Sequence, residues 1–86
     1  MHKLEELFEK YSDFELLTMD GFDDCIVGVA EGFEISPKVV YCTDKVINKL
    51  MTHHGMTEEE AVEYFNFNQK GAYVGEYTPL FLCPAY

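Results

Sequence analysis

The stretch that decides the fold is Thr57–Leu82, TEEEAVEYFNFNQKGAYVGEYTPLFL. Thr57 and Glu60 have the spacing of a capping box, in which each side chain bonds the other residue's backbone N–H at a helix start. The glutamates of this first turn also lie where the helix dipole favours negative charge. Gly71 is predicted to break the helix, and the apolar residues Leu80–Cys83 predict a short closing strand between two prolines.

Upstream of this stretch, the chain predicts two more helices. Thr43 is a good N-cap for a helix from residue 44 to about residue 53, and Gly55 follows as a C-terminal stop. Near the N-terminus, apolar residues recur at helical spacing over residues 3–11, with charged residues between them. We therefore expect one amphipathic helix at each of these places.

Two apolar runs, Cys25–Ala30 and Lys38–Cys42, predict strands, and their short polar link predicts an antiparallel hairpin. The expected order is α-β-β-α-α-β within one domain over residues 1–86. The predicted fold class is α+β, with a small three-stranded antiparallel sheet packed against helices. Because the first strand is apolar on both faces, it predicts either cover on both sides or an interface, such as edge pairing into a homodimer.

The charge balance excludes some partners. The chain of 86 residues carries 16 acidic residues against 6 lysines, has no arginine, and has a formal net charge of -10. Direct binding of DNA or RNA is not expected, because arginine and positive charge dominate such contacts. An acidic surface favours either a basic protein partner or solubility alone.

The chain also shows no membrane or export signal. No apolar run approaches the roughly 20 residues of a membrane span. The first residues, MHKLEE, lack the apolar segment of a signal peptide. A cytoplasmic protein is expected.

The three cysteines, Cys25, Cys42 and Cys83, each fall in a predicted strand. Their odd number and wide spacing are typical of small buried hydrophobic residues in a reducing compartment. No Cys-x-x-Cys pair supports a zinc or redox site.

Two other polar segments have local explanations. The acidic loop Asp20–Asp24 lacks the alternation of oxygen ligands that calcium needs, so a capped turn is the expected structure. His53 and His54 end a predicted helix, where the dipole favours histidine, and neighbouring residues on a helix diverge too far to chelate one ion. No metal site, cofactor or catalytic residue is therefore predicted.

The segment Tyr64–Asn68 allows two interpretations. The inward stripe of its helix is predicted to be Ala61, Val62 and Phe65. Tyr64 and Phe67 fall on a neighbouring stripe, where they could pack on the sheet while an asparagine caps the helix end. Alternatively, they form an aromatic and amide patch for gripping a partner, because aromatic residues anchor interfaces. The candidate partner-binding residues are Glu63, Tyr64, Asn66, Phe67, Asn68, Tyr73 and Tyr77.

Two parts of the sequence resemble a group of small bacteriophage and prophage proteins of uncharacterised function. They are the turn DGFDD at residues 20–24 and the segment EEAVEYFNFNQKGAYVGEYTP at residues 59–79, in which GAYVGE is the most specific part. The likeness covers about the final two-thirds of the chain. It implies a phage or prophage origin and carries no activity with it.

Three functions follow from these observations. The first is a non-enzymatic protein that binds a protein partner. In a stronger version of this hypothesis, it inhibits a host nucleic-acid-binding or defence factor by presenting carboxylates where phosphates would lie. The second is a homodimeric structural or assembly protein. The third, an enzyme or small-ligand binder using His53, Asp23, Asn66 or Tyr73, is least favoured, because a small domain without a motif offers little pocket.

Overall fold

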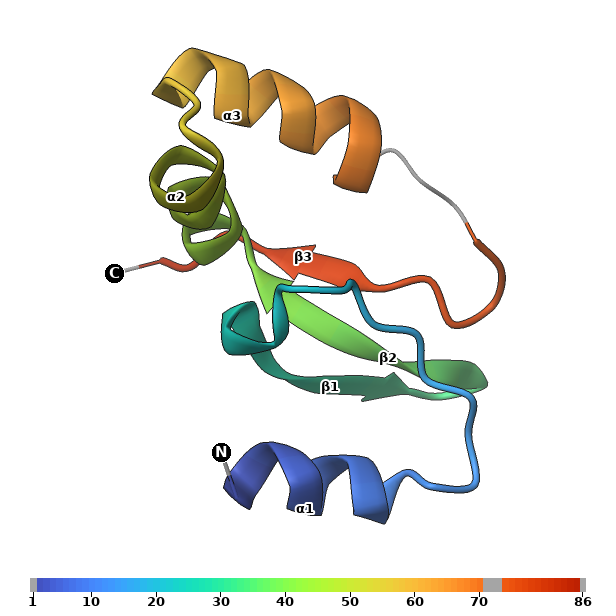
Figure 1. The fold of residues 1–86 in the computed structure, drawn as a ribbon. Helices are drawn as coiled ribbons and strands as arrows, with labels where there is room; N and C mark the ends of the chain where they lie inside the picture. Colours follow the sequence, from blue (N-terminus) through green and yellow to red (C-terminus); the bar gives the residue numbers. More distant parts are fainter. Residues whose placement is uncertain (1, 71–73, 86) are drawn as a thin grey trace.

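The structure is a computed structural model that describes residues 2–70 and 74–85. Within these residues, three α-helices, three strands and two short helical segments form a small α+β fold (Figure 1). In chain order they are α1 (His2–Lys10), η1 (Asp23–Cys25), β1 (Ile26–Gly32), β2 (Ile35–Cys42), α2 (Thr43–His54), α3 (Glu58–Phe65), η2 (Asn66–Lys70) and β3 (Leu80–Leu82). The α+β class is confirmed, while η1 and η2 make the order differ from the predicted α-β-β-α-α-β. None of the described helices is long and apolar enough to cross a membrane.

The sheet has the order β1-β2-β3 and is mixed. The predicted hairpin is present: β1 and β2 are antiparallel, joined by a tight turn in which Glu34 has a left-handed backbone with φ 59°. The prediction of a purely antiparallel sheet is wrong, because β3 pairs parallel to β2. A parallel neighbour needs a long crossover that returns the chain to the starting end of the sheet, and here α2, α3 and η2 make that crossover.

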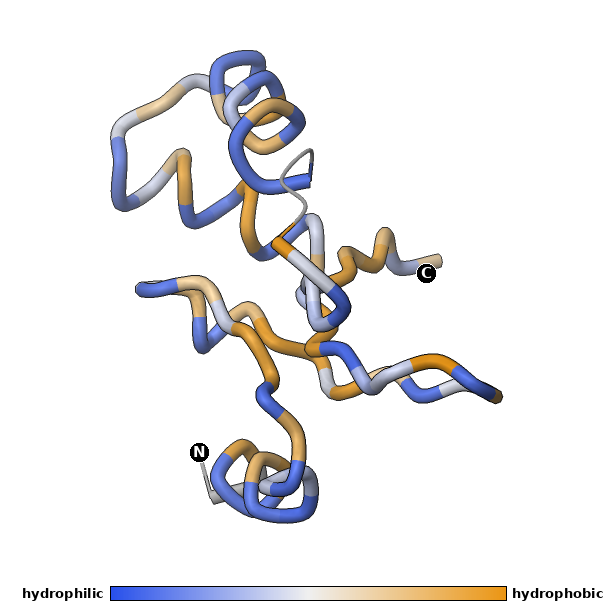
Figure 2. Tube along the Cα trace, turned by 90° about the vertical axis from the view of Figure 1, so that its right-hand side faces the viewer, coloured by the Kyte–Doolittle hydropathy of each residue, from blue (hydrophilic) through white to orange (hydrophobic). Residues whose placement is uncertain are grey.

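Strand register collects the core on one face of the sheet. Ile26 of β1 and Phe81 of β3 both pair with Tyr41 of β2, so the three side chains share a face. Phe65 of α3 meets Phe81 edge-on, with ring centroids 4.9 Å apart. The buried cluster on this face contains Phe22, Cys25, Val39, Tyr41, Val46, Leu50, Ala61 and Phe65. In Figure 2 the hydrophobic strands run between the N-terminal helix and the helices of the crossover.

The connection between α1 and η1 also packs on this core. Leu16 and Met19 contact the buried cluster, and the Met19 backbone N–H donates a hydrogen bond of 2.6 Å to the Tyr41 hydroxyl. Burial raises the pKa of the Tyr41 phenol, which favours the neutral hydroxyl as the acceptor. Tyr41 of β2 therefore anchors the α1–η1 connection, which has no regular secondary structure of its own.

The capping box predicted at the start of α3 and the glycine stop predicted at the end of α2 are both present. The Thr57 hydroxyl accepts from the Glu60 N–H at 3.2 Å, and Glu60 accepts from the Thr57 N–H at 2.9 Å, so the capping box is confirmed. Gly55 ends α2 with a left-handed backbone at φ 67°. The prediction that Thr43 is an N-cap is wrong, because β2 runs directly into α2 and Cys42 takes the cap position without a side-chain bond. The predicted stop at Gly71 lies outside the described residues.

The cysteines differ from their prediction in two places. Cys42 ends β2 and is buried, as expected, whereas Cys25 lies in η1 and Cys83 follows β3. Cys83 is exposed, because β3 ends at Leu82 before the cysteine can enter the sheet. Burial, with the neighbouring Asp24 carboxylate, raises the pKa of the Cys25 thiol to about 11.

We expect one thiol to react in the folded protein. With a disulfide reagent at neutral pH, Cys83 should react rapidly, while Cys25 and Cys42 should react only after unfolding, because access and thiolate formation control reactivity. Timed labelling with peptide mass spectrometry measures this difference. A Cys83→Ser variant should lose the rapid phase; a rapid phase that persists would contradict the placement of Cys83.

Candidate functional site

The candidate site is the exposed side of α3 and η2. Ala61 and Phe65 of α3 are buried against the core, which turns the residues between and after them toward solvent. Tyr64 is 43% exposed and Phe67 is 80% exposed, although both are large apolar side chains. We call this the α3–η2 surface, and it comprises Glu58, Glu59, Val62, Glu63, Tyr64, Asn66, Phe67 and Asn68.

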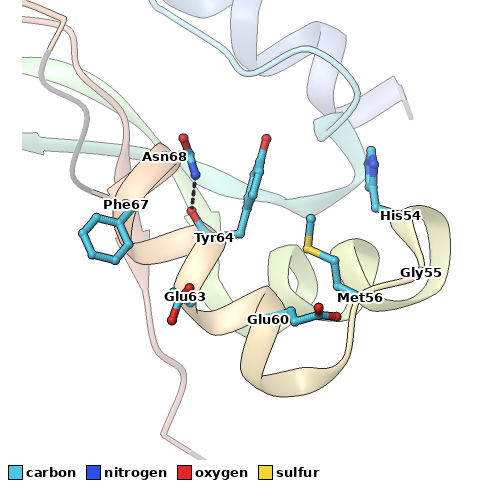
Figure 3. A pocket seen from close by; sticks show the side chains of 8 residues that line it. All are labelled: His54, Gly55, Met56, Glu60, Glu63, Tyr64, Phe67 and Asn68. Atoms are coloured by element: carbon cyan, nitrogen blue, oxygen red, sulfur yellow. Dashed lines mark hydrogen bonds between the residues drawn. The ribbon is translucent and has the colours of Figure 1, made fainter.

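Two grooves flank the centre of the α3–η2 surface. The first, about 490 Å³, lies between the end of α2 and α3 and is lined by His54, Gly55, Met56, Glu60, Glu63, Tyr64, Phe67 and Asn68 (Figure 3). The second, also about 490 Å³, is lined by Glu58, Glu59, Val62, Glu63, Asn66 and Phe67. Because Glu63 and Phe67 line both grooves, they form the centre of the surface.

The π-helical turn η2 holds the amide side chains in place. The Asn68 side-chain N–H₂ donates to the Tyr64 carbonyl oxygen at 3.2 Å (Figure 3). A carbonyl oxygen can only accept, so this bond sets the orientation of the Asn68 amide. The bond spans four residues and joins η2 to the last turn of α3.

The charged side chains of the α3–η2 surface are all acidic. Glu58, Glu59 and Glu63 are exposed, whereas the Glu60 carboxylate is engaged in the capping box. The surface therefore presents carboxylates beside exposed rings, and none of the described residues that line the two grooves is a lysine.

The structure brings together five of the seven predicted partner-binding residues. Glu63, Tyr64, Asn66, Phe67 and Asn68 share the α3–η2 surface. Tyr77 does not line either groove; its ring lies 6.5 Å from that of Phe14 and it is partly buried. Tyr73 lies outside the described residues.

The packing interpretation of Tyr64 and Phe67 is wrong in its main point. Neither side chain is buried on the sheet; Phe65 takes that place against Phe81. Its second point holds in part, because Asn68 does bond the last turn of α3. Val62, predicted to face inward, is 38% exposed, since Ala61 and Phe65 alone define the narrow buried stripe.

Sequence reasoning missed the side of the groove that α2 contributes. Figure 3 shows Tyr64 and His54 on either side of Met56, and both His54 and Met56 line the first groove. These residues line the same groove as Tyr64 because α2 and α3 pack against each other, which no local pattern in residues 53–56 indicates. The Gly55 stop was the available signal, because it makes the chain turn back at this point.

Among the residues considered for catalysis, the three that the structure describes lie on separate elements, and Tyr73 is outside the described residues. His53 is exposed at the end of α2, where its Nδ1 lies 3.0 Å from the Thr52 hydroxyl, and Asp23 is exposed in η1. Asn66 belongs to the α3–η2 surface. In the acidic loop, Asp24 pairs with Lys49 at 2.8 Å, and this hydrogen bond lowers the pKa of the Asp24 carboxyl. No three histidine, cysteine, aspartate or glutamate side chains in the described parts of the chain are grouped to hold a metal ion.

Comparisons of the chain with models of protein families, with curated proteins and with solved structures find no significant match.

Proposed function

We propose that this chain is a non-enzymatic protein that binds a basic protein partner through the α3–η2 surface. The observation that carries the proposal is Phe67, a phenylalanine that is 80% exposed beside the carboxylate of Glu63. An exposed ring does not stabilise the fold, whereas a ring flanked by a polar rim is typical of the anchor of an interface.

The charge of the whole chain supports a basic partner. A net charge of -10 attracts a positively charged surface over distances of about a Debye length and speeds association. The resemblance to phage and prophage proteins favours a bacterial protein as the target, met in the host cytoplasm. A nucleic-acid-binding or defence protein is the class of target that an acidic inhibitor would fit, because its basic surface normally meets phosphates.

Not every carboxylate of α3 supports such mimicry of phosphates. Glu60 is part of the capping box, and Glu58 and Glu59 stabilise the helix dipole in the first turn. Glu63 has neither role, so it is the carboxylate whose position folding does not explain. Its replacement by glutamine, combined with Glu5→Gln and Glu9→Gln on α1, tests charge mimicry over the wider surface.

We expect Phe67→Ala to weaken capture of the partner by roughly tenfold, because interface anchors carry a large share of binding energy. The tagged full-length protein is used as bait in bacterial lysate, and co-purified proteins are quantified by mass spectrometry at low and moderate salt. The expected partner is basic, is retained by the native chain and is lost more readily at moderate salt.

The matched control is Phe33→Ala. Phe33 is 90% exposed at the tip of the β1–β2 hairpin, so the same truncation is made on a different element. The Phe33→Ala protein should retain the partner, and circular dichroism should show all three proteins folded. Equal retention by the Phe67→Ala and native proteins would reject the α3–η2 surface as the binding site.

A homodimeric structural or assembly protein is the alternative, and one observation favours it. On the sheet face opposite the core, register places Gly28, Val40 and Leu80 in one row across the three strands. A Cβ built on Gly28 would meet no described atom within 4 Å, and Leu80 is 44% exposed, so this row is open at Gly28 and Leu80. Light scattering at high micromolar concentration separates the two proposals, because a monomer excludes the homodimer.

A further inference from the structure

We infer that the α3–η2 surface takes an arginine side chain of its partner rather than a lysine, with the guanidinium bound at the Glu63–Phe67 pair. This inference rests on the proposed function and names the chemistry by which the partner is recognised. The inference is based on charge complementarity. The two grooves bring carboxylates and aromatic rings together, and no described residue lining them is a lysine.

Hydrogen-bonding groups at the centre of the surface are mainly acceptors. The Glu63 carboxylate is exposed, and the Asn68 amide already donates to the Tyr64 carbonyl oxygen. A ligand that fits these groups must bring donors. Guanidinium brings five N–H donors in a planar fork and accepts nothing, which matches the two oxygens of the Glu63 carboxylate better than a hydroxyl or an amide would.

The same region has few donors for an anion. The backbone N–H groups of Gly55 and Met56, which border the first groove, both donate to the Leu50 carbonyl oxygen within the end of α2. They are therefore not available to a phosphate or a carboxylate. The exposed carboxylates Glu58, Glu59 and Glu63 would also repel such a ligand.

The exposed rings decide between arginine and lysine. Phe67 and Tyr64 lie three residues apart on consecutive turns, and both border the first groove with Glu63. A guanidinium stacks flat on an aromatic ring while its edge bonds a carboxylate, and it is more weakly hydrated than an ammonium group. A lysine could satisfy the charge of Glu63 but would gain little from the rings on a solvent-exposed surface.

The test compares two peptides of equal length and charge, one alternating arginine with glycine and the other alternating lysine with glycine. Each is titrated into the full-length protein and followed by amide chemical shifts. We expect the arginine peptide to bind roughly tenfold more tightly, with shift changes concentrated at residues 54–56 and 60–68. Phe67→Ala and Glu63→Gln should each weaken the arginine peptide by roughly threefold or more and reduce the difference between the peptides.

Phe33→Ala and Glu15→Gln, at two exposed residues outside the α3–η2 surface, are the matched controls and should leave both affinities unchanged. Equal affinity for the two peptides, or shift changes spread over α1 and the sheet, would overturn the arginine site. If the lysine peptide binds equally well while Phe67→Ala still loses the captured partner, the proposed function stands without arginine selectivity. If Phe67→Ala keeps the captured partner, the proposed function itself fails, whichever peptide binds.

Discussion

Leu50→Ala is expected to lower the free energy of unfolding by about 3 kcal/mol. Leu50 of α2 is 1% exposed and belongs to the buried cluster that joins the sheet to the helices of the crossover. Truncation removes the transfer free energy of the lost methyl groups and leaves a cavity that a packed core fills only in part. For a domain of this size, the melting temperature should fall by roughly 15 °C.

The control uses the same chemical change at an exposed residue on the sheet face opposite the core. Leu82 of β3 is 45% exposed, so Leu82→Ala should change the free energy of unfolding by less than about 1 kcal/mol. Urea denaturation followed by circular dichroism measures both variants. Similar losses from the two substitutions would mean that Leu50 is not the better buried residue and that the helix pair does not pack as described.

Tyr41→Phe is expected to lower the free energy of unfolding by about 2 kcal/mol. The ring remains in place, but the hydroxyl that accepts the Met19 N–H at 2.6 Å is removed. Tyr41 is fully buried, and a donor left without a partner beside it pays the full cost of desolvation. The α1–η1 connection should loosen, because this bond joins it to the middle strand.

Hydrogen exchange of the Met19 amide, together with urea denaturation, measures this effect. The matched control is Tyr64→Phe, which removes a hydroxyl from an exposed side chain and should change stability by less than about 0.5 kcal/mol. A Tyr41→Phe protein as stable as the native chain, with unchanged protection of Met19, would show that this hydrogen bond does not hold the α1–η1 connection in place.

Part of the candidate site could be predicted from the sequence, because one helix carries it. The helical period brings Glu63, Tyr64 and Phe67 close together, and the same period separates them from the buried Phe65. Tyr77 was assigned to the same patch only by its closeness in sequence. Its place beside Phe14 depends on the path of the chain after η2, which has no repeating pattern to follow.

The sequence by itself determined the features that depend on residues a few positions apart. The capping box of Thr57 and Glu60 and the left-handed stop at Gly55 are of this kind. The antiparallel β1–β2 hairpin also belongs here. In each case the interacting groups are joined by a short piece of chain, so the residue types and their spacing suffice to predict the contact.

Only the tertiary structure decided how distant segments meet. The parallel pairing of β3 follows from the crossover through α2 and α3, and the edge-on contact of Phe65 with Phe81 holds the returning chain on the core face. The same packing places Met56 beside Tyr64 and leaves Cys83 beyond the sheet. An apolar strand can pair in either direction, and burial of the whole core, to which many distant side chains contribute together, selects one.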